Sequence, residues 1–555
     1  MEHIRISNLR CLADSSAIEI RPISLLVGAN SSGKSTFLRV FPLLKQSHEM
    51  RTLGGLVLNE GDVNFGFFHE ALRKGAAPPE LKLEFGFTLA QTYFQGTAWN
   101  RYLVEPINIS CELIYVHRAQ DPRYPRLRAL NLSLKAEGST DTIVITADDD
   151  GGITEFQVNT FSASNDEKKA LRLRIGRGLV PQLVTGLTKD DSLDSSFESD
   201  RGTSPFDKRL LSETNIYFHG RTARETRLAT FRDIKLGSPE KMLEQFRQTG
   251  AWTWRERVRD WKVSSVPFQN LRNLLLANRT SDILESVNLY VSQLAQSVHY
   301  FQPVRASAER DYLSRDVSVT SVNSTGLNVA MVLASLSTSD QMRFRSWMGE
   351  HFGFEVFPQS VGDGARVSLR MKDTASGSEF NLADTGFGFS QMLPFLVQVW
   401  SLIEHRESRQ PSVRRRSLTG YYSWFASSLI NSFIIAIEQP ELHLHPALQA
   451  RLADLIVTMT RVSKKQGVPV RFVLETHSQT IIERIGQCVE SKLLETADVQ
   501  VILFELDRNQ PNNNISKVRI VNYDDQGILT DWPFGFFSAP PIPPARTENI
   551  TQDVV

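Results

Sequence analysis

The sequence contains few cysteines, and their positions exclude two structural roles. Its 555 residues include only Cys11, Cys111 and Cys488, which lie far apart and form no CxxC pair. This spacing argues against a disulfide framework and against a structural zinc site. It favours a reducing, cytoplasmic setting.

Long apolar runs and excess charge are also missing. No apolar segment reaches the roughly 18 residues that a membrane-spanning helix needs, and the first ten residues lack the apolar core of a secretion signal. Because 62 Lys and Arg balance 62 Asp and Glu, any nucleic-acid surface must be local. At roughly 100–200 residues per domain, the length predicts two to four domains without membrane contact.

Hydrophobic periodicity indicates an α/β part at each end of the chain with an insertion between them. Residues 1–45 show the pattern strand, strand, loop, helix, and strands and helices alternate again after residue 360. Short alternating strands fill 82–160, and 160–300 is mainly helical apart from a Ser/Asp-rich loop at 188–206. We expect an N-terminal part at 1–90, an insertion at 91–330, a C-terminal part at 331–537 and a disordered tail at 538–555.

The strongest motif is GANSSGKST at 28–36, between an apolar strand and an apolar-periodic helix. Glycines in such a loop let backbone N–H groups and the helix N-terminus surround a phosphate. The lysine reaches the β- and γ-phosphates, and the serine hydroxyl ligates Mg²⁺. The residues expected to bind the nucleotide here are Gly28, Asn30, Gly33, Lys34, Ser35 and Thr36.

A second motif, FIIAIEQPELHLHP at 433–446, is an apolar strand with Glu438 at its C-terminal end. Open α/β sheets place ligands at such ends, so Glu438 can hold Mg²⁺ opposite Ser35. His443 and His445 allow a zinc interpretation. Their i, i+2 spacing before a proline supplies no third ligand, and a packed structural turn is favoured.

Two further motifs carry weaker signals. In RFVLETHS, His477 follows an apolar strand and can contact a γ-phosphate or the attacking water, or have only a structural role. In DTGFGFSQ, Gly386, Gly388 and Ser390 precede a helix and form another anion cradle, or an ordinary turn capped by Ser390. A second cradle makes most sense if it covers the nucleotide of another subunit.

In this order the motifs resemble the ABC-type ATPase fold, in the branch of RecF, SMC/Rad50 heads and OLD-like defence ATPases. Residues 527–537, with WPFGFF, and the segments at 303–305 and 309–312 are similar to the PtuA-type ATPases of Septu and retron-linked antiphage systems. The resemblance implies an α/β ATPase head, a mixed sheet with a P-loop, and a large β-then-α insertion between Walker A and the signature. It implies ATP and Mg²⁺ as cofactors, Glu438 as the Walker B acid, 386–391 as the signature and His477 as the switch histidine.

The same resemblance implies partners. They are an HNH-type nuclease and, in retrons, a reverse transcriptase with its RNA–DNA hybrid. A second copy is also expected, in a head-to-tail dimer with Ser390 of one chain facing Lys34 of the other, or in a higher oligomer.

One position departs from the family pattern. Gln439 stands where a second carboxylate usually polarises the attacking water, and an amide cannot accept a proton. Glu441 is close in sequence, but we expect the intervening proline to point it elsewhere. Tight ATP binding with slow or conditional hydrolysis is therefore predicted, with Glu438, Gln439 and His477 as the catalytic residues.

Several stretches mix basic and aromatic residues. The stretches 217–235 and 252–262 suit nucleic acid. In the second, Trp254, Val258 and Trp261 are also spaced like a helix stripe that packs into a core or a protein–protein interface, which is favoured there. The arginines at 406–416 either bind phosphate or keep a loop solvated, and Arg305 is a phosphate contact only by the resemblance.

Three functions follow from these features. The first is an ATP-gated regulator of a separate nuclease, because Glu505 and Asp507 imitate only part of a nuclease site and 78 residues after His477 are too few for a nuclease domain. The second is a RecF- or SMC-like DNA-repair ATPase that acts on DNA directly. The third is a nucleotide-locked scaffold with little turnover, for which Gln439 is the telling residue.

Overall fold

The structure is a computed structural model of the 555-residue chain. It describes residues 2–50, 55–89, 103–176, 178–185, 204–303, 308–313, 321–362, 364–384, 387–403, 432–467, 469–506 and 515–532. Several predicted features lie outside these residues: most of the Ser/Asp-rich loop, Arg305, Gly386, the arginines at 406–416, Asp507, nearly all of WPFGFF and the tail at 538–555. No helix among the described residues is both long and apolar enough to cross a membrane.

The centre of the fold is a group of parallel strands that are buried on both faces. Their order is β20 (Val499–Leu506), β4 (Ile23–Gly28), β19 (Val470–Glu475), β18 (Phe433–Glu438) and β13 (Val298–Phe301). Near-continuous apolar runs are typical of such strands, because both sides of the sheet are covered. Val473 joins one hydrophobic core, and its neighbours Phe472 and Leu474 join the other.

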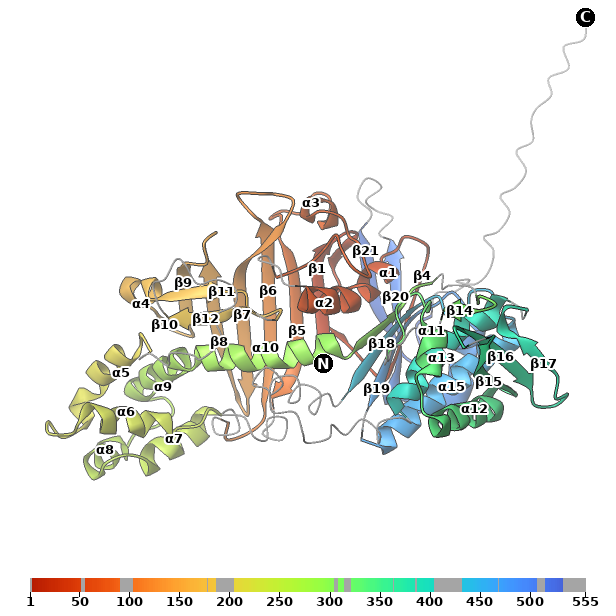
Figure 1. The fold of residues 1–555 in the computed structure, drawn as a ribbon. Helices are drawn as coiled ribbons and strands as arrows, with labels where there is room; N and C mark the ends of the chain where they lie inside the picture. The colour runs from red at the N-terminus through yellow and green to blue at the C-terminus, as the bar shows by residue number, and fades with distance from the viewer. Residues whose placement is uncertain are drawn as a thin grey trace, which may run out of the picture.

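Helices and a small sheet cover these strands. The helices α1 (Lys34–Leu38) and α2 (Val40–Glu49) follow β4. The C-terminal part adds α11 (Val329–Ala334), α12 (Thr338–Phe352), α13 (Phe387–Ile403), α15 (Pro446–Lys465) and α16 (Gln479–Glu490). It also contains a sheet of β14 (Tyr312–Leu313), β15 (Phe354–Val361), β16 (Arg366–Asp373) and β17 (Glu379–Asn381), which lies beside these helices at the right of Figure 1.

The same sheet continues into the insertion. From β20 it runs through β21 (Ser516–Val521), β2 (Leu12–Asp14) and β1 (His3–Leu9), with β3 (Ile18–Glu19) paired to β1. It then becomes an antiparallel series: β5 (Leu81–Leu89), β6 (Ile107–His117), β7 (Pro125–Ala136), β8 (Ser139–Ala147), β9 (Ile153–Val158) and β10 (Phe161–Ser162). A short pair, β11 (Leu171–Arg174) and β12 (Gln182–Thr185), lies next to it.

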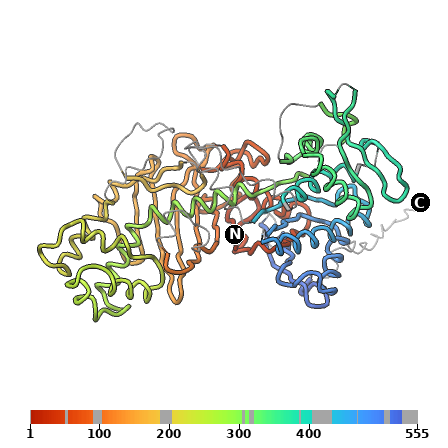
Figure 2. The backbone as a smooth tube through the Cα atoms, turned by 60° about the horizontal axis from the view of Figure 1, so that its bottom comes forward, coloured from red at the N-terminus to blue at the C-terminus, as the bar shows by residue number. Residues whose placement is uncertain are grey.

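Helices complete the insertion. They are α4 (Asn165–Lys169), α5 (Asp207–Thr214), α6 (Arg224–Arg232), α7 (Pro239–Gln248), α8 (Trp252–Val258), α9 (Val266–Asn278) and α10 (Thr280–Gln296). Figures 1 and 2 show α10 running along the antiparallel strands toward the parallel strands, while α5–α8 form a lobe at the far end. The expected class, a mixed α/β head interrupted by a large β-then-α insertion, is confirmed.

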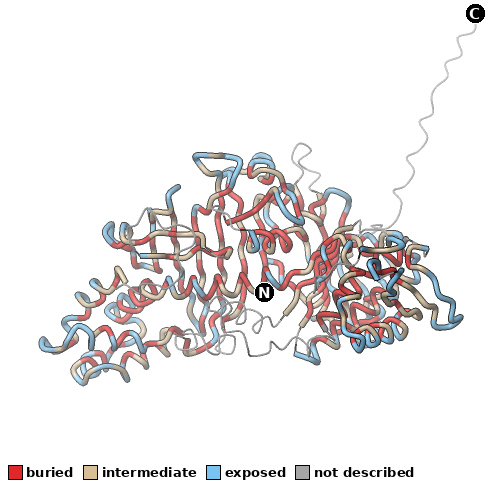
Figure 3. Tube along the Cα trace, in the orientation of Figure 1, coloured by how far each residue is buried: buried red, intermediate tan, exposed pale blue. Residues whose placement is uncertain are grey.

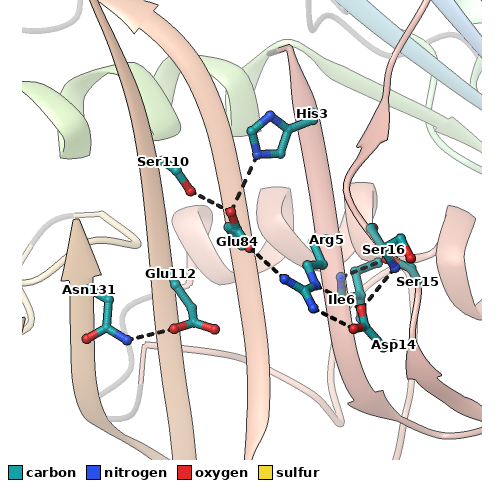
Figure 4. A network of polar contacts seen from close by, with 10 residues as sticks. All are labelled: His3, Arg5, Ile6, Asp14, Ser15, Ser16, Glu84, Ser110, Glu112 and Asn131. Atoms are coloured by element: carbon teal, nitrogen blue, oxygen red, sulfur yellow. Dashed lines mark hydrogen bonds and ion pairs between the residues drawn. The ribbon is translucent and has the colours of Figure 1, made fainter. Parts of the chain in front are cut away.

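One face of β1, β5 and β6 carries a polar network (Figure 4). Glu84 accepts a hydrogen bond from Ser110 at 2.5 Å and lies 3.6 Å from His3 Nε2 and 3.8 Å from Arg5 Nη1. Arg5 also donates to both carboxylate oxygens of Asp14. The apolar residues of these strands alternate with these polar ones and face the core, as period-2 strands require.

Candidate functional site

The predicted phosphate loop connects β4 to α1, and close contacts explain both of its glycines. A Cβ on Gly28 would lie 2.3 Å from the carbonyl oxygen of Phe504 in β20. Gly33 has a φ of 101°, and a Cβ there would lie 2.9 Å from Ser516 Oγ. Ser516 Oγ also donates a 2.6 Å hydrogen bond to the carbonyl of Ser32, which fixes the loop against β21. A side chain at position 28 would collide with the backbone of β20, and one at position 33 would be strained by the positive φ and would crowd the side chain of Ser516.

Lys34 is buried at the start of α1, with 3% of its side chain exposed. Its Nζ donates a 2.7 Å hydrogen bond to the carbonyl of Ala29 in its own loop and lies 3.8 Å from Glu475 Oε1. Burial lowers the pKa of Lys34, while the charge of Glu475 opposes that shift. Asn30 is exposed at the rim of the loop, and Thr36 is half-buried.

Two buried carboxylates lie side by side beneath the loop. Glu438 ends β18 and Glu475 ends β19, and the two residues are register partners in the parallel sheet. Glu475 Oε1 accepts a 2.9 Å hydrogen bond from Ser35 Oγ. Burial raises the pKa of Glu475, and the neighbouring charge of Glu438 adds to the shift, whereas the Ser35 bond opposes it.

Both oxygens of Glu438 are bound within the chain. Arg39 Nε and Nη2 donate to them at 2.6 and 2.8 Å, and the Tyr300 hydroxyl donates to Oε1 at 2.7 Å. Burial and the charge of Glu438 raise the pKa of Tyr300, so its hydroxyl remains a donor at neutral pH. Glu438 is thus held by a planar fork and a phenol.

The chain turns sharply after β18 and brings Glu441 to the site. Gln439 has a φ of 44°, a left-handed conformation, and its N–H donates to the carbonyl of Glu475 at 2.8 Å. Glu441 Oε1 accepts a 2.6 Å hydrogen bond from the backbone N–H of His477, and its charge reaches Lys34. The expectation that the proline points Glu441 elsewhere is wrong, because the left-handed turn at Gln439 compensates for it.

His477 follows β19 and is exposed. Partial burial lowers its pKa, and the charge of Lys34 adds to the shift, so the imidazole is neutral at neutral pH. The next residue, Ser478, caps α16 by accepting a hydrogen bond from the N–H of Ile481 at 3.0 Å. The histidine is therefore placed at the rim of the loop by a strand end and a capped helix.

The signature segment begins α13. A Cβ on Gly388 would lie 2.4 Å from the carbonyl oxygen of His443, so this glycine lets the first turn of α13 pack on the turn after β18. Ser390 is buried within the chain, at 7% exposure, and does not project from the surface. Asp384, just before the segment, forms a 2.6 Å ion pair with Arg310.

The two histidines after Glu438 belong to a structural turn. Both are exposed, and His445 Nδ1 accepts a hydrogen bond from the N–H of Ala447, capping α15. Across the described residues no group of three His, Cys, Asp or Glu is arranged to hold a metal ion. The cap that His445 forms on α15 is a structural contact of this turn.

The predicted stripe of Trp254, Val258 and Trp261 packs into the core of the helical lobe, although α8 ends at Val258 and Trp261 follows it. Trp254 and Val258 are fully buried and Trp261 is 8% exposed, which confirms the core interpretation for these residues. Trp254 stacks on Phe218 with ring centroids 5.1 Å apart. Trp252, on another face of α8, remains 68% exposed.

Sequence reasoning missed three residues of the site: Arg39, Tyr300 and Glu475. Arg39 carries a faint signal, because it follows Ser35 by one helical turn and so lies on the same side. Glu475 also has one, since it ends an apolar strand as Glu438 does. Tyr300 has none, because only the tertiary fold brings β13 beside β18.

Comparison with known proteins identifies a family. A family model described as an AAA ATPase domain matches residues 1–112 and 280–482, leaving out most of the insertion. No curated protein matches the chain. Three similar solved structures share 10% identity with it.

The first is the Smc head domain with an extended coiled coil bound to the C-terminal domain of ScpA, derived from Pyrococcus furiosus, with coverage of 94% of this chain and 96% of that chain and a TM-score of 0.33. The second is an SmcHead bound to the C-winged helix domain of ScpA, with coverage of 94% and 97% and a TM-score of 0.32. The third is the SMC head domain from Thermotoga maritima, with coverage of 93% and 97% and a TM-score of 0.31.

Proposed function

The chain belongs to the AAA ATPase domain family, and on this premise we propose that it binds MgATP at the 28–36 loop and hydrolyses it slowly. The observation that carries the proposal is the buried Lys34 and the half-buried Ser35 beside two buried carboxylates, at the carboxyl ends of parallel strands. A positive charge, a hydroxyl and two carboxylates at a helix N-terminus suit a phosphate chain with its metal ion.

The residues have separate tasks in this proposal. Lys34 leaves the Ala29 carbonyl and pairs with the β- and γ-phosphates, while the N–H groups of 29–34 surround them. Bound Mg²⁺ supplies charge neutralisation of the phosphates. Neutral His477 orients the attacking water, and Gln439 cannot take its proton. We assign that proton to Glu441, whose carboxylate is held by the His477 N–H.

A wider role follows from the family resemblance of the motifs. We propose a cytoplasmic, ATP-gated component of an antiphage system, which regulates a separate HNH-type nuclease and, in a retron, works with a reverse transcriptase and its RNA–DNA hybrid. Glu505, which imitates part of a nuclease site in the sequence, lies 3.7 Å from Arg519 in an ion pair. A dimer of heads, with Ser390 toward the partner's nucleotide, completes the proposal and requires α13 to shift, since Ser390 is buried in one chain.

Nucleotide binding and phosphate release by the purified protein test the enzymatic part. We expect a fluorescent ATP analogue to bind in the presence of Mg²⁺ and turnover below about 10 s⁻¹, the median for enzymes. Lys34→Ala should weaken binding by about tenfold or more, because it removes the phosphate-pairing charge. Lys169→Ala, an exposed lysine of the insertion, is the control. Absence of binding by the wild-type chain contradicts the proposal, and tight binding without turnover supports the scaffold instead.

Co-purification tests the wider role. Expressed with its neighbouring genes, the native protein should elute with a nuclease subunit, and Lys34→Ala should abolish phage resistance. A protein that elutes alone, combined with unchanged resistance in Lys34→Ala, contradicts the defence role. Sedimentation with ATP tests assembly, since a monomer at micromolar concentration contradicts the dimer.

Direct action on nucleic acid is the second candidate, and the charge of the helical lobe favours it. Residues 207–262 contain thirteen Lys and Arg against eight Asp and Glu, in a chain with no net charge. Exposed Arg221, Arg224, Arg255 and Arg257 lie in this lobe with exposed Trp252. Basic residues beside an exposed aromatic ring suit single-stranded nucleic acid.

A further inference from the structure

The carboxylate that faces the metal-ligating hydroxyl of the phosphate loop is Glu475. The side chain of Glu475 is 3% exposed, and its Oε1 accepts the hydrogen bond of Ser35 Oγ at 2.9 Å. This results from the strand order, because β19, which ends at Glu475, lies between β4 and β18. Glu438, the acid that the motif predicts, ends the strand one position farther from the loop.

Glu438 is already neutralised by other groups of the chain. The guanidinium of Arg39 binds both of its oxygens, and Tyr300 adds a third donor. Bidentate charge-assisted bonds are among the stronger polar contacts in proteins. Removing Arg39 from Glu438 would leave a buried carboxylate to be paired again, which is costly. Glu438 is thus poorly available to a cation.

Glu475, unlike Glu438, has an oxygen that no donor of the described residues binds. This oxygen, Oε2, is buried. An unsatisfied buried carboxylate oxygen is costly unless a partner binds it. Its nearest cation, Lys34, is the side chain that phosphates attract away. A divalent cation fits this position because such ions prefer carboxylate and hydroxyl oxygens.

We propose that Glu475, with the Ser35 hydroxyl, is the protein carboxylate of the Mg²⁺ site, and that Glu438 is a positioning residue held by Arg39 and Tyr300. The proposal rests on the proposed binding of MgATP. In this proposal the nucleotide phosphates supply the remaining oxygens. The Glu438–Arg39 pair then fixes α1 against β18 and keeps Ser35 directed at Glu475.

Isosteric variants distinguish the two carboxylates. Glu475→Gln keeps an oxygen that accepts the Ser35 hydrogen bond but removes the charge, and Glu438→Gln does the same beside Arg39. The readout is Mn²⁺ affinity by electron paramagnetic resonance, measured with a non-hydrolysable ATP analogue bound to the full-length chain. We expect Glu475→Gln to weaken Mn²⁺ binding by about tenfold or more and Glu438→Gln by less than about threefold.

Two comparisons keep the test decisive. Glu475→Asp retains the charge but withdraws it by one methylene, so its Mn²⁺ affinity should lie between those of the wild type and Glu475→Gln. Wild-type Mn²⁺ affinity in both variants of Glu475, or a larger loss in Glu438→Gln, overturns the inference. If the wild-type chain binds neither nucleotide nor Mn²⁺, the proposed function itself fails.

Discussion

At the scale of single residues, the position of Glu441 changes what Gln439 implies about proton transfer during hydrolysis. An amide at position 439 removes the usual proton acceptor, yet a carboxylate two residues later is hydrogen-bonded to the backbone of His477. Its charge also reaches Lys34. Under the proposed function, Glu441 is therefore a carboxylate that could act as the base on the side where the phosphates would lie.

Glu441→Gln tests this role, because the amide oxygen can still accept the His477 N–H. We expect single-turnover phosphate release to fall by about 10²–10⁴-fold, the range for loss of a general base, with nucleotide affinity retained. Phosphate release and binding of a fluorescent ATP analogue measure the two effects. Glu490→Gln, an exposed glutamate at the end of α16, is the control. Wild-type release in Glu441→Gln would leave Glu441 with only a structural part.

The sequence predicts the phosphate-loop residues and Glu438 of the site, but not Glu475 or the groups that hold Glu438. The loop residues are contiguous, so one motif places Lys34 and Ser35 together. Arg39 and Tyr300 meet Glu438 across 399 and 138 residues of chain. No local pattern encodes such pairs, since the strand order of the sheet creates them.

At the scale of elements, a proline divides the helix that follows the loop. Apolar spacing predicts one helix through 37–44, but the structure has α1 and α2 with Arg39 between them. Pro42 has no N–H to donate to the carbonyl of Leu38, and its ring crowds that carbonyl. The interruption falls at Arg39, which binds Glu438. The break between the two helices therefore coincides with a residue of the site.

Two tryptophans on α8 give a matched pair for stability. Trp254 is fully buried among aromatic rings and donates to the Phe246 carbonyl at 2.8 Å, whereas Trp252 is 68% exposed. Trp254→Ala should lower the free energy of unfolding by about 3–5 kcal/mol through cavity formation. Trp252→Ala should change it by less than about 0.5 kcal/mol. Denaturant unfolding measures both, and equal effects would contradict the burial of the stripe.

The polar network on β1, β5 and β6 predicts a pH effect. Contacts of Glu84 with His3 and then Ser110 lower its pKa, against the opposing effect of burial. A lowered folded-state pKa contributes stability above the unfolded value of about 4.5, and this contribution is lost as pH falls below it. Glu84→Gln should therefore be less stable than wild type by about 1 kcal/mol at pH 7, and the difference should be smaller at about pH 4, below the unfolded value. Chemical unfolding at both pH values measures this, with Glu137→Gln, 83% exposed, as control. A pH-independent difference would contradict the assignment.

At the scale of the whole molecule, one sheet joins the nucleotide site to the insertion. Among the described residues the sheet has 15 strands, and buried residues follow it from end to end in Figure 3. Sequence periodicity predicts the strands but not this continuity, because β20 and β21 come from the end of the chain and insert between β4 and β2. Only long-range pairing decides that order. One hydrophobic cluster extends from the helices that follow the phosphate loop to the helical lobe, so the two regions are connected by continuous packing.

Charge is distributed unevenly along the molecule, and the lobe formed by 207–262 has an excess of Lys and Arg over Asp and Glu. The double variant Arg255→Glu with Arg257→Glu should weaken binding of a single-stranded oligonucleotide by about tenfold or more at low salt. It should also make the dependence on salt concentration less steep, because fewer counterions are released. Trp252→Ala should weaken binding by about 1–3 kcal/mol through lost stacking, with little change in the salt slope.

Fluorescence anisotropy at 50 and 200 mM salt, roughly the range over which phosphate contacts are most visible, measures both effects. Arg366→Glu, an exposed arginine of the small sheet, controls for the general loss of positive charge. If the lobe variants bind like the wild type while Arg366→Glu does not, the basic lobe is not the nucleic-acid surface. Its arginines would then be available to an acidic protein partner, and a nuclease subunit that elutes with the wild type but not with the double variant would identify that partner. The lobe lies at the far end of the sheet from the phosphate loop (Figure 1). The experiment therefore distinguishes whether the part of the molecule far from the nucleotide site binds nucleic acid or a protein partner.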